Sequence, residues 1–136
     1  MARLSDDDRR LRAVTEAAWQ ATVLQELRWH GWIAQHQSTS MRLITVRGQR
    51  VPVGDAQSKG MLDTFAVHPG HGWTVWIELK RQVGAKVTPE QAAVIDALTV
   101  NAVGHRVAVL RPADRSVLRQ LATAPWAVSQ QELPIR

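Results

Sequence analysis

The sequence predicts one α/β domain built around a small mixed β-sheet, and three segments lead to this prediction. The run Trp73–Lys80 is rich in aromatic and β-branched residues, as buried strands are. A turn at His68–Gly72 joins it to an earlier strand-like run, Gly60–Val67, which predicts an antiparallel hairpin. A helix beginning at Thr88 separates Trp73–Lys80 from a third run, Arg106–Leu110, and such a crossover makes the two strands parallel.

Composition narrows the class of protein. A chain of 136 residues with 45% hydrophobic residues is long enough for a sizeable core, and we treat residues 1–136 as a single domain. The absence of cysteine excludes disulfides and thiolate metal sites, and it fits a cytoplasmic protein. No apolar run approaches the roughly 20 residues that span a bilayer, so we expect no membrane association. The formal net charge of +5 favours an anionic partner such as nucleic acid.

The first element is predicted to be one long helix. Ser5 is a good N-cap, three aspartates follow it in the first turn, and the helical pattern continues to about His30. Gly31 stands where a C-terminal glycine belongs. Residues at four-residue spacing form an inward apolar stripe, which consists of Trp19, Val23 and Leu27.

Two polar pairs have a plain structural interpretation. Glu16 and Gln20 lie four residues apart beside the apolar stripe, and the helix pattern alone makes them solvated residues at its edge. His68 and His71 occupy the predicted turn between two strands. No further ligand cluster accompanies them, so we interpret them as turn residues rather than as a zinc site.

A basic, polar segment over about residues 38–59 follows a short predicted strand at Trp32–Gln37. Within it, Leu43–Val46 and Arg50–Val53 flank a short Gly-containing turn, which is the pattern of a β-hairpin. The segment is either a solvated loop or an arm that follows a phosphate backbone. The segment contains only one acidic residue, Asp55. Its basic residues are the candidate nucleic-acid-binding residues, Arg42, Arg47, Arg50 and Lys59.

The residues that could carry chemistry gather around the central strand. Side chains alternate along a strand, so Glu78 and Lys80 share one face at the rim of the core, and Asp63 lies near the start of the neighbouring strand. Taken alone, Glu78 and Lys80 read as a structural ion pair, because buried charges are costly unless they are paired or bind a metal. Two carboxylates from adjacent strands plus a backbone carbonyl also suit Mg²⁺ or Mn²⁺.

The segment after the central strand predicts a helix, a strand and a second helix. Thr88–Gln91 forms a capping box with proline at the first helical position, and Gln91 has a second possible role facing the core strand. Gly104 is predicted to end this helix. Arg111–Asp114 leads into a last helix through about Ala122, and the tail after Pro125 reads as irregular.

Together these residues resemble the PD-(D/E)xK nuclease superfamily, and most closely its VRR-NUC family. The resemblance covers roughly Thr15 to Leu121, and it depends on the order and spacing of short motifs. One departure is visible, since Leu62 stands where the family has a proline. The residues that match the family pattern are, in order, Glu16, Asp63, Glu78, Lys80, Gly84, Thr88, Pro89, Gln91, Gly104 and Val107–Leu110.

The resemblance implies a restriction-endonuclease-like fold, with helices flanking a mixed sheet in the element order α-β-β-β-α-β. The core would cover about residues 15–121, with the basic hairpin as an insertion. It also implies hydrolysis of DNA phosphodiester bonds leaving a 5′-phosphate, with Mg²⁺ or Mn²⁺ as cofactor and no small-molecule cofactor. The implied location is the cytoplasm of a bacterial or phage-infected cell.

The resemblance also implies a role for each matching polar residue. Asp63 and Glu78 would bind the metal, with the backbone carbonyl of Leu79 as a further ligand. The other implied catalytic roles are positioning of the attacking water by Lys80, binding of a metal-bound water or second ion by Glu16, and orientation of Lys80 or the scissile phosphate by Gln91.

Assembly and partner are implied by the same resemblance. Stand-alone members of the family act as dimers on branched DNA, which implies a homodimer that prefers Holliday junctions or flaps to linear duplex. Trp29, Trp32 and Trp126 could serve such an interface or simply complete the monomer core. Two other classes stay open: a catalytically inactive nucleic-acid-binding module of the same fold, and an interaction domain whose tryptophans mark a partner surface.

Overall fold

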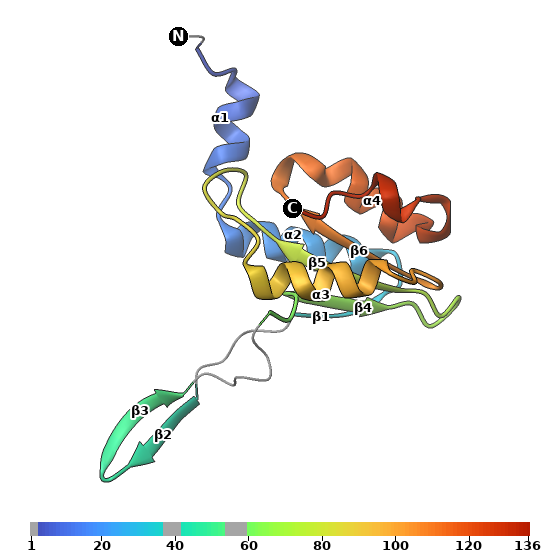
Figure 1. The fold of residues 1–136 in the computed structure, drawn as a ribbon. Helices are drawn as coiled ribbons and strands as arrows, with labels where there is room; N and C mark the ends of the chain where they lie inside the picture. The colour runs from blue at the N-terminus through green and yellow to red at the C-terminus, as the bar shows by residue number, and fades with distance from the viewer. Residues whose placement is uncertain (1–2, 37–41, 54–59) are drawn as a thin grey trace.

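A computed structural model describes residues 3–36, 42–53 and 60–136 of the chain. Two helices come first, five strands follow, and a helix, a strand and a last helix complete the chain (Figure 1). In chain order they are α1 (Asp6–Ala13), α2 (Glu16–Trp29), β1 (Ile33–His36), β2 (Arg42–Val46), β3 (Gln49–Val53), β4 (Thr64–Val67), β5 (Thr74–Leu79), α3 (Pro89–Thr99), β6 (His105–Leu110) and α4 (Arg115–Thr123), with short 3₁₀ turns at Pro112–Asp114, Pro125–Ala127 and Gln130–Glu132.

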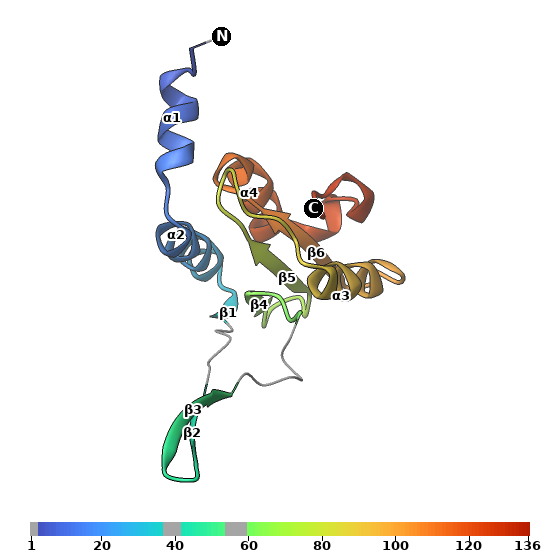
Figure 2. The same ribbon diagram turned by 60° about the vertical axis from the view of Figure 1, so that its left-hand side comes forward.

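Four of the strands form one mixed sheet in the order β1-β4-β5-β6. Strand β4 is antiparallel to both β1 and β5, whereas β5 and β6 are parallel. Helices α2 and α4 pack on one face of this sheet and α3 packs on the other (Figures 1 and 2). The predicted α/β class, the β4–β5 hairpin and the parallel β5–β6 pair are therefore confirmed.

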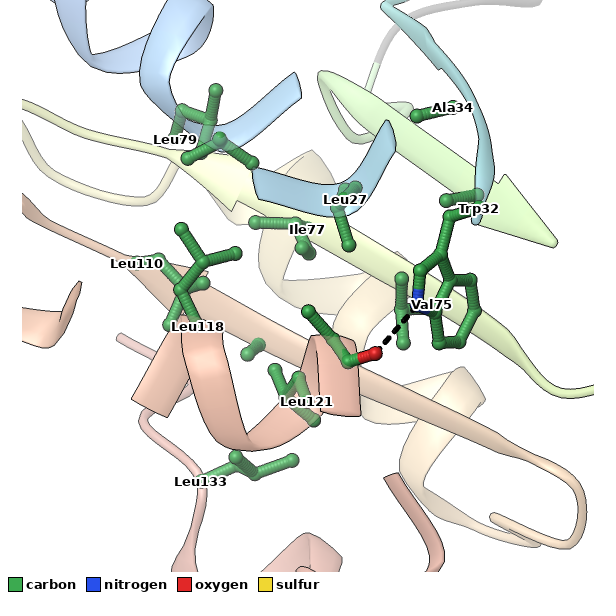
Figure 3. Close-up of a cluster of buried hydrophobic side chains, with 14 of the residues drawn as sticks. Leu27, Trp32, Ala34, Val75, Ile77, Leu79, Leu110, Leu118, Leu121 and Leu133 are labelled. Atoms are coloured by element: carbon green, nitrogen blue, oxygen red, sulfur yellow. Dashed lines mark hydrogen bonds between the residues drawn. The ribbon is translucent and has the colours of Figure 1, made fainter. Parts of the chain in front are cut away.

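The larger core lies between the sheet and the helices α2 and α4 (Figure 3). The predicted stripe of α2 is fully buried there against alternate residues of β5, namely Val75, Ile77 and Leu79. Two buried tryptophans close this core with hydrogen bonds as well as with apolar area. The indole Nε1 of Trp32 donates to the carbonyl of Ala122 at 2.8 Å, which ties the start of β1 to the end of α4.

A smaller core lies on the other face of the sheet, under α3. Ile95 of α3 packs there on Val107 and Val109 of β6 and on Leu62, with Trp76 of β5 at its border. The two cores confirm that successive residues of β5 point to opposite faces. They also place the Glu78 side of that strand under α3.

The expected single N-terminal helix is wrong, because the chain forms two helices, α1 and α2. Val14 between them has extended backbone, with ψ of 121°. The hydroxyl of Thr15 accepts a hydrogen bond from the amide of Ala18 at 3.1 Å, so Thr15 starts a new helix as a competing N-cap. Gly31 has φ of +87° and ends α2, as predicted. None of the helices that the structure describes is long and apolar enough to cross a membrane.

Three other boundaries differ from the prediction. The strand expected from Gly60 begins only at Thr64, because Gly60 has φ of +90° and turns the chain. Helix α3 ends at Thr99 rather than at Gly104, so Ala102 does not continue its buried face. The irregular tail instead forms two short 3₁₀ turns, which begin at Pro125 and Gln130.

This tail covers the outer edge of β6. The side-chain amide of Gln130 accepts a hydrogen bond from the Val107 amide at 2.8 Å and donates one to the Val107 carbonyl at 2.7 Å. Further along, the amide of Val109 donates to the carbonyl of Pro134 at 2.7 Å. Leu133 is buried in the larger core. The tail thus satisfies edge groups that would otherwise be open to pairing with another strand.

The predicted hairpin is present as a separate two-stranded sheet, β2–β3 (Figure 1). Its turn contains Arg47 and Gly48, with φ of +51° and +78°, the combination that tight hairpin turns need. Arg47 is exposed at this turn. Of the other predicted nucleic-acid-binding residues, Lys59 and the side chains of Arg42 and Arg50 lie outside the part that the structure describes.

We expect Gly60→Ala to lower the free energy of unfolding by about 2–4 kcal/mol. The methyl group would lie 2.7 Å from the carbonyl oxygen of Glu90, so the first turn of α3 would have to move. Gly72→Ala is the matched control, because Gly72 also has a positive φ but no atom lies within 4 Å of the added carbon. It should cost about 1 kcal/mol. Urea unfolding followed by tryptophan fluorescence measures both, and equal losses would contradict the close contact at Gly60.

Candidate functional site

The acidic and basic residues singled out in the sequence meet where β4 begins and β5 ends. Asp63 directly precedes β4, Glu78 is the second-last residue of β5, and Lys80 directly follows β5. The antiparallel pairing of Thr64 with Ile77 brings the first two of these residues side by side across the hairpin. The hairpin therefore supplies the geometry that the sequence pattern predicts.

A closed set of hydrogen bonds connects these residues. Oε1 of Glu78 accepts a hydrogen bond from Nε2 of Gln91 at 2.8 Å and lies 3.1 Å from Nζ of Lys80. Oε2 of Glu78 accepts from the amide of Asp63 at 3.2 Å. In return, Oδ2 of Asp63 accepts from the amide of Leu79 at 3.0 Å. The two carboxylates are thus held by each other's strands.

The electrostatics of the site depend on the burial of Glu78, which is only 1% exposed. Burial, and then the nearby negative charge of Asp63, raise the pKa of Glu78 to about 7, although the ammonium of Lys80 acts in the opposite direction. Two carboxylates face one ammonium, so the fully ionised set carries an excess negative charge. A cation between the carboxylates would relieve that excess.

The residues present fit a hard divalent cation. Both side chains offer carboxylate oxygens, which Mg²⁺ and Mn²⁺ prefer. Among the described residues, no group of three or more histidine, cysteine, aspartate and glutamate side chains could hold a metal ion. The protein would therefore supply two carboxylates, Asp63 and Glu78, with backbone, water and substrate oxygens completing the shell. Mg²⁺ sites that act on phosphates commonly have this composition.

Gln91 makes both predicted contacts, one within the capping box of α3 and one with the core strand. Its Oε1 accepts a hydrogen bond from the amide of Thr88 at 3.0 Å and completes the capping box of α3. Its Nε2 at the same time donates to Glu78. The amino-terminal turn of α3 is consequently held at the carboxylate, where the helix dipole favours negative charge.

Glu16 is not brought into this hydrogen-bond network. It is exposed in the first turn of α2, and its side chain makes no hydrogen bond or ion pair with any described residue. Its helix nevertheless starts at the same end of the sheet. The carbonyl of Leu110 accepts hydrogen bonds from the amide of Lys80 at 3.1 Å and from Nε1 of Trp19 at 3.0 Å. The predicted roles of Glu16 therefore stay predictions.

The two histidines of the β4–β5 turn are used by the turn itself. Their rings stack with 3.9 Å between centroids. Nδ1 of His68 accepts from the amide of Gly70 at 3.0 Å, and Nδ1 of His71 accepts from the amide of Trp73 at 3.2 Å. Burial and the neighbouring His68 lower the pKa of His71. These contacts agree with the interpretation of the pair as turn residues.

Sequence reasoning missed the residue that organises the loop after Lys80. The guanidinium of Arg111 donates to the carbonyls of Arg81 at 2.6 Å and of Ala85 at 2.9 Å. An arginine directly after a buried strand was the available signal, but its partners are distant in sequence. The loop thus has a defined anchor beside the site.

Comparisons with known proteins add nothing to this geometry. No protein-family model matches the chain, and searches of curated proteins and of solved structures also found no match. The site is therefore defined by its own contacts. Those contacts join residues from three separate segments, Asp63, Glu78–Lys80 and Gln91, around one buried carboxylate.

We expect ionised Glu78 to destabilise the metal-free protein. Its pKa is about 7 in the folded state against a usual 4.5, so between these values the folded state holds the proton more tightly than the unfolded state. Stability should therefore fall as the pH rises through this window, by up to about 3 kcal/mol. Glu78→Gln, which is neutral throughout, should lack this decline in urea unfolding in EDTA across the same pH range. Parallel pH profiles for the two proteins would contradict the pKa shift.

Proposed function

We propose that this protein is a metal-dependent DNA endonuclease with a restriction-endonuclease-like fold of the PD-(D/E)xK superfamily, similar to the VRR-NUC family. The observation that carries the proposal is the hydrogen-bonded set of Asp63, Glu78, Lys80 and Gln91 at the end of two paired strands. A purely structural ion pair needs only one acid and one base. Here the second acid, Asp63, raises the free-energy cost of burying Glu78 in its ionised form, which favours a site built for a cation.

Each residue has a chemical role in this proposal. Asp63 and Glu78 would hold Mg²⁺ or Mn²⁺, and the ion would polarise the phosphate and lower the pKa of a water molecule at the site. Lys80 uses one N–H on Glu78, so its remaining donors can orient the attacking water and offset charge on the phosphate. Gln91 holds Glu78 in place. The water oxygen would bond to phosphorus as the P–O3′ bond breaks. The water gives up a proton and the departing 3′ oxygen takes one, so the products are a 5′-phosphate and a 3′-hydroxyl.

The basic hairpin is proposed as the arm that follows the DNA backbone. The exposed position of Arg47 at the β2–β3 turn supports this role. A catalytically inactive nucleic-acid-binding module is the alternative. One observation favours it: Glu16, the third acid of the family pattern, makes no contact with the carboxylate pair among the described residues. Cleavage assays separate the two.

We expect Glu78→Ala and Asp63→Ala to lower DNA cleavage in Mg²⁺ by on the order of 100-fold or more, because each removes a negative ligand. Lys80→Ala should lose activity while metal affinity, measured by calorimetry, is retained. Asp96→Ala is the control, because Asp96 forms an exposed ion pair with Arg136 at 3.0 Å, away from the site. EDTA should abolish all cleavage. Wild-type rates in the Glu78 variant, or cleavage that persists in EDTA, would contradict the assignment.

We further propose a homodimer that prefers branched DNA. Trp29 at the end of α2 is 83% exposed and Ile33 at the start of β1 is 63% exposed, whereas Trp32 is buried and belongs to the monomer core. Light scattering should give a mass near twice the 15.2 kDa of the chain. Cleavage of a four-way junction should be faster than cleavage of a matched duplex. A monomer mass with equal rates on both substrates would contradict this proposal.

A further inference from the structure

We propose that the loop joining β5 to α3, residues 81–87, is a rigid DNA-binding surface in which Arg81 and Lys86 contact backbone phosphates beside the scissile bond. The inference rests on the proposed nuclease function. It assigns a second DNA contact, separate from the basic hairpin, and gives Arg111 the role of a positioning residue. Three properties of the loop support it: its anchoring, its exposed cations and its location.

The anchoring comes from the connection between β6 and α4. Both terminal guanidinium nitrogens of Arg111 donate hydrogen bonds, Nη1 to the carbonyl of Arg81 at 2.6 Å and Nη2 to the carbonyl of Ala85 at 2.9 Å. The side-chain oxygen of Gln82 accepts a third hydrogen bond, from the amide of Ala113 at 2.9 Å. Hydrogen bonds from a charged donor are stronger than neutral ones. The loop backbone is therefore ordered before any ligand binds.

The anchored loop carries two exposed cationic side chains, Arg81 and Lys86. Two of the loop carbonyls turn inward to Arg111, and the side chains of Arg81, Val83 and Lys86 are exposed. Neither Arg81 nor Lys86 makes a side-chain hydrogen bond or ion pair within the part of the chain that the structure describes. Both charges are thus available to an external anion. A preordered backbone also lowers the entropy that binding would cost.

The location ties the loop to the candidate site at both ends. Lys80 directly precedes the loop, and the capping box that contains Gln91 directly follows it. Both ribbon views show the loop extending beyond the carboxyl end of β5 (Figures 1 and 2). One DNA strand carries a phosphate about every 3.4 Å along the helix axis. On this proposal, a strand with one phosphate at Lys80 presents its neighbouring phosphates to Arg81 and Lys86.

The test measures binding of a labelled duplex by fluorescence anisotropy across a salt series in EDTA, so that cleavage does not interfere. Each phosphate contact contributes about 0.9 to the slope of log affinity against log salt. The double variant Arg81→Gln/Lys86→Gln should therefore bind more weakly, with a slope smaller by about 2. The control Arg115→Gln/Arg119→Gln removes the same charge from exposed residues of α4 and should keep the wild-type slope.

A second variant tests the positioning role. Arg111→Lys keeps the charge but cannot donate to both carbonyls in the same geometry. If Arg111 orders the loop for DNA, this variant should also show a reduced salt slope. A merely structural residue would lower the melting temperature and leave the slope unchanged, which would overturn the positioning role.

The outcomes separate the loop from the nuclease proposal. A wild-type slope in the double variant, or an equal loss in the α4 control, would overturn the loop surface while DNA binding itself stands. A wild-type protein that binds no duplex at low salt would overturn the nuclease proposal and the loop with it. A reduced slope confined to the loop variants, with calorimetric Mg²⁺ affinity unchanged, is the expected result.

Discussion

The burial of the Glu78 carboxylate is the constraint on which the arrangement of this domain depends. A buried charge with a partner removed costs several kcal/mol, and Glu78 is 1% exposed. Its partners come from different parts of the chain: the backbone amide of Asp63 before β4, the ammonium of Lys80 after β5, and the side-chain amide of Gln91 in α3. Satisfying this one group fixes the hairpin, the strand end and the helix start relative to one another.

The apolar packing of the two cores offsets the free-energy cost of burying this charged site. On one face, α2 and α4 bury the apolar side chains of β5, and on the other face α3 packs over Leu62 and Val107. Gly60 lets the chain approach the first turn of α3 closely enough to bring Asp63 beside Glu78. The apolar packing and the polar network therefore share the same elements, so a change in the position of α3 alters both.

Local patterns predicted much of this structure, and contacts between distant segments account for what they missed. The capping box at Thr88–Gln91 and the β4–β5 hairpin depend on neighbouring residues, so sequence alone was sufficient. The break before Thr15 was missed because the helical pattern continues across it and tertiary packing decides which cap is used. The Gln130 cover on β6 and the Arg111 anchor join residues more than 20 positions apart, for which the sequence holds no local signal.

The residues of the candidate site also differ in whether local strand pairing or the packing of a distant helix determines their positions. The pairing of β4 with β5 places Asp63 beside Glu78, and the alternation of side chains along an extended chain puts Lys80 on the same side as Glu78. Glu16 is placed only through the packing of α2, which meets the site end of the sheet at one shared acceptor, the carbonyl of Leu110. Because that carbonyl binds both Trp19 and the backbone of Lys80, a shift of α2 would reach the strand end directly. The core tryptophan thereby couples the first helix to the candidate site.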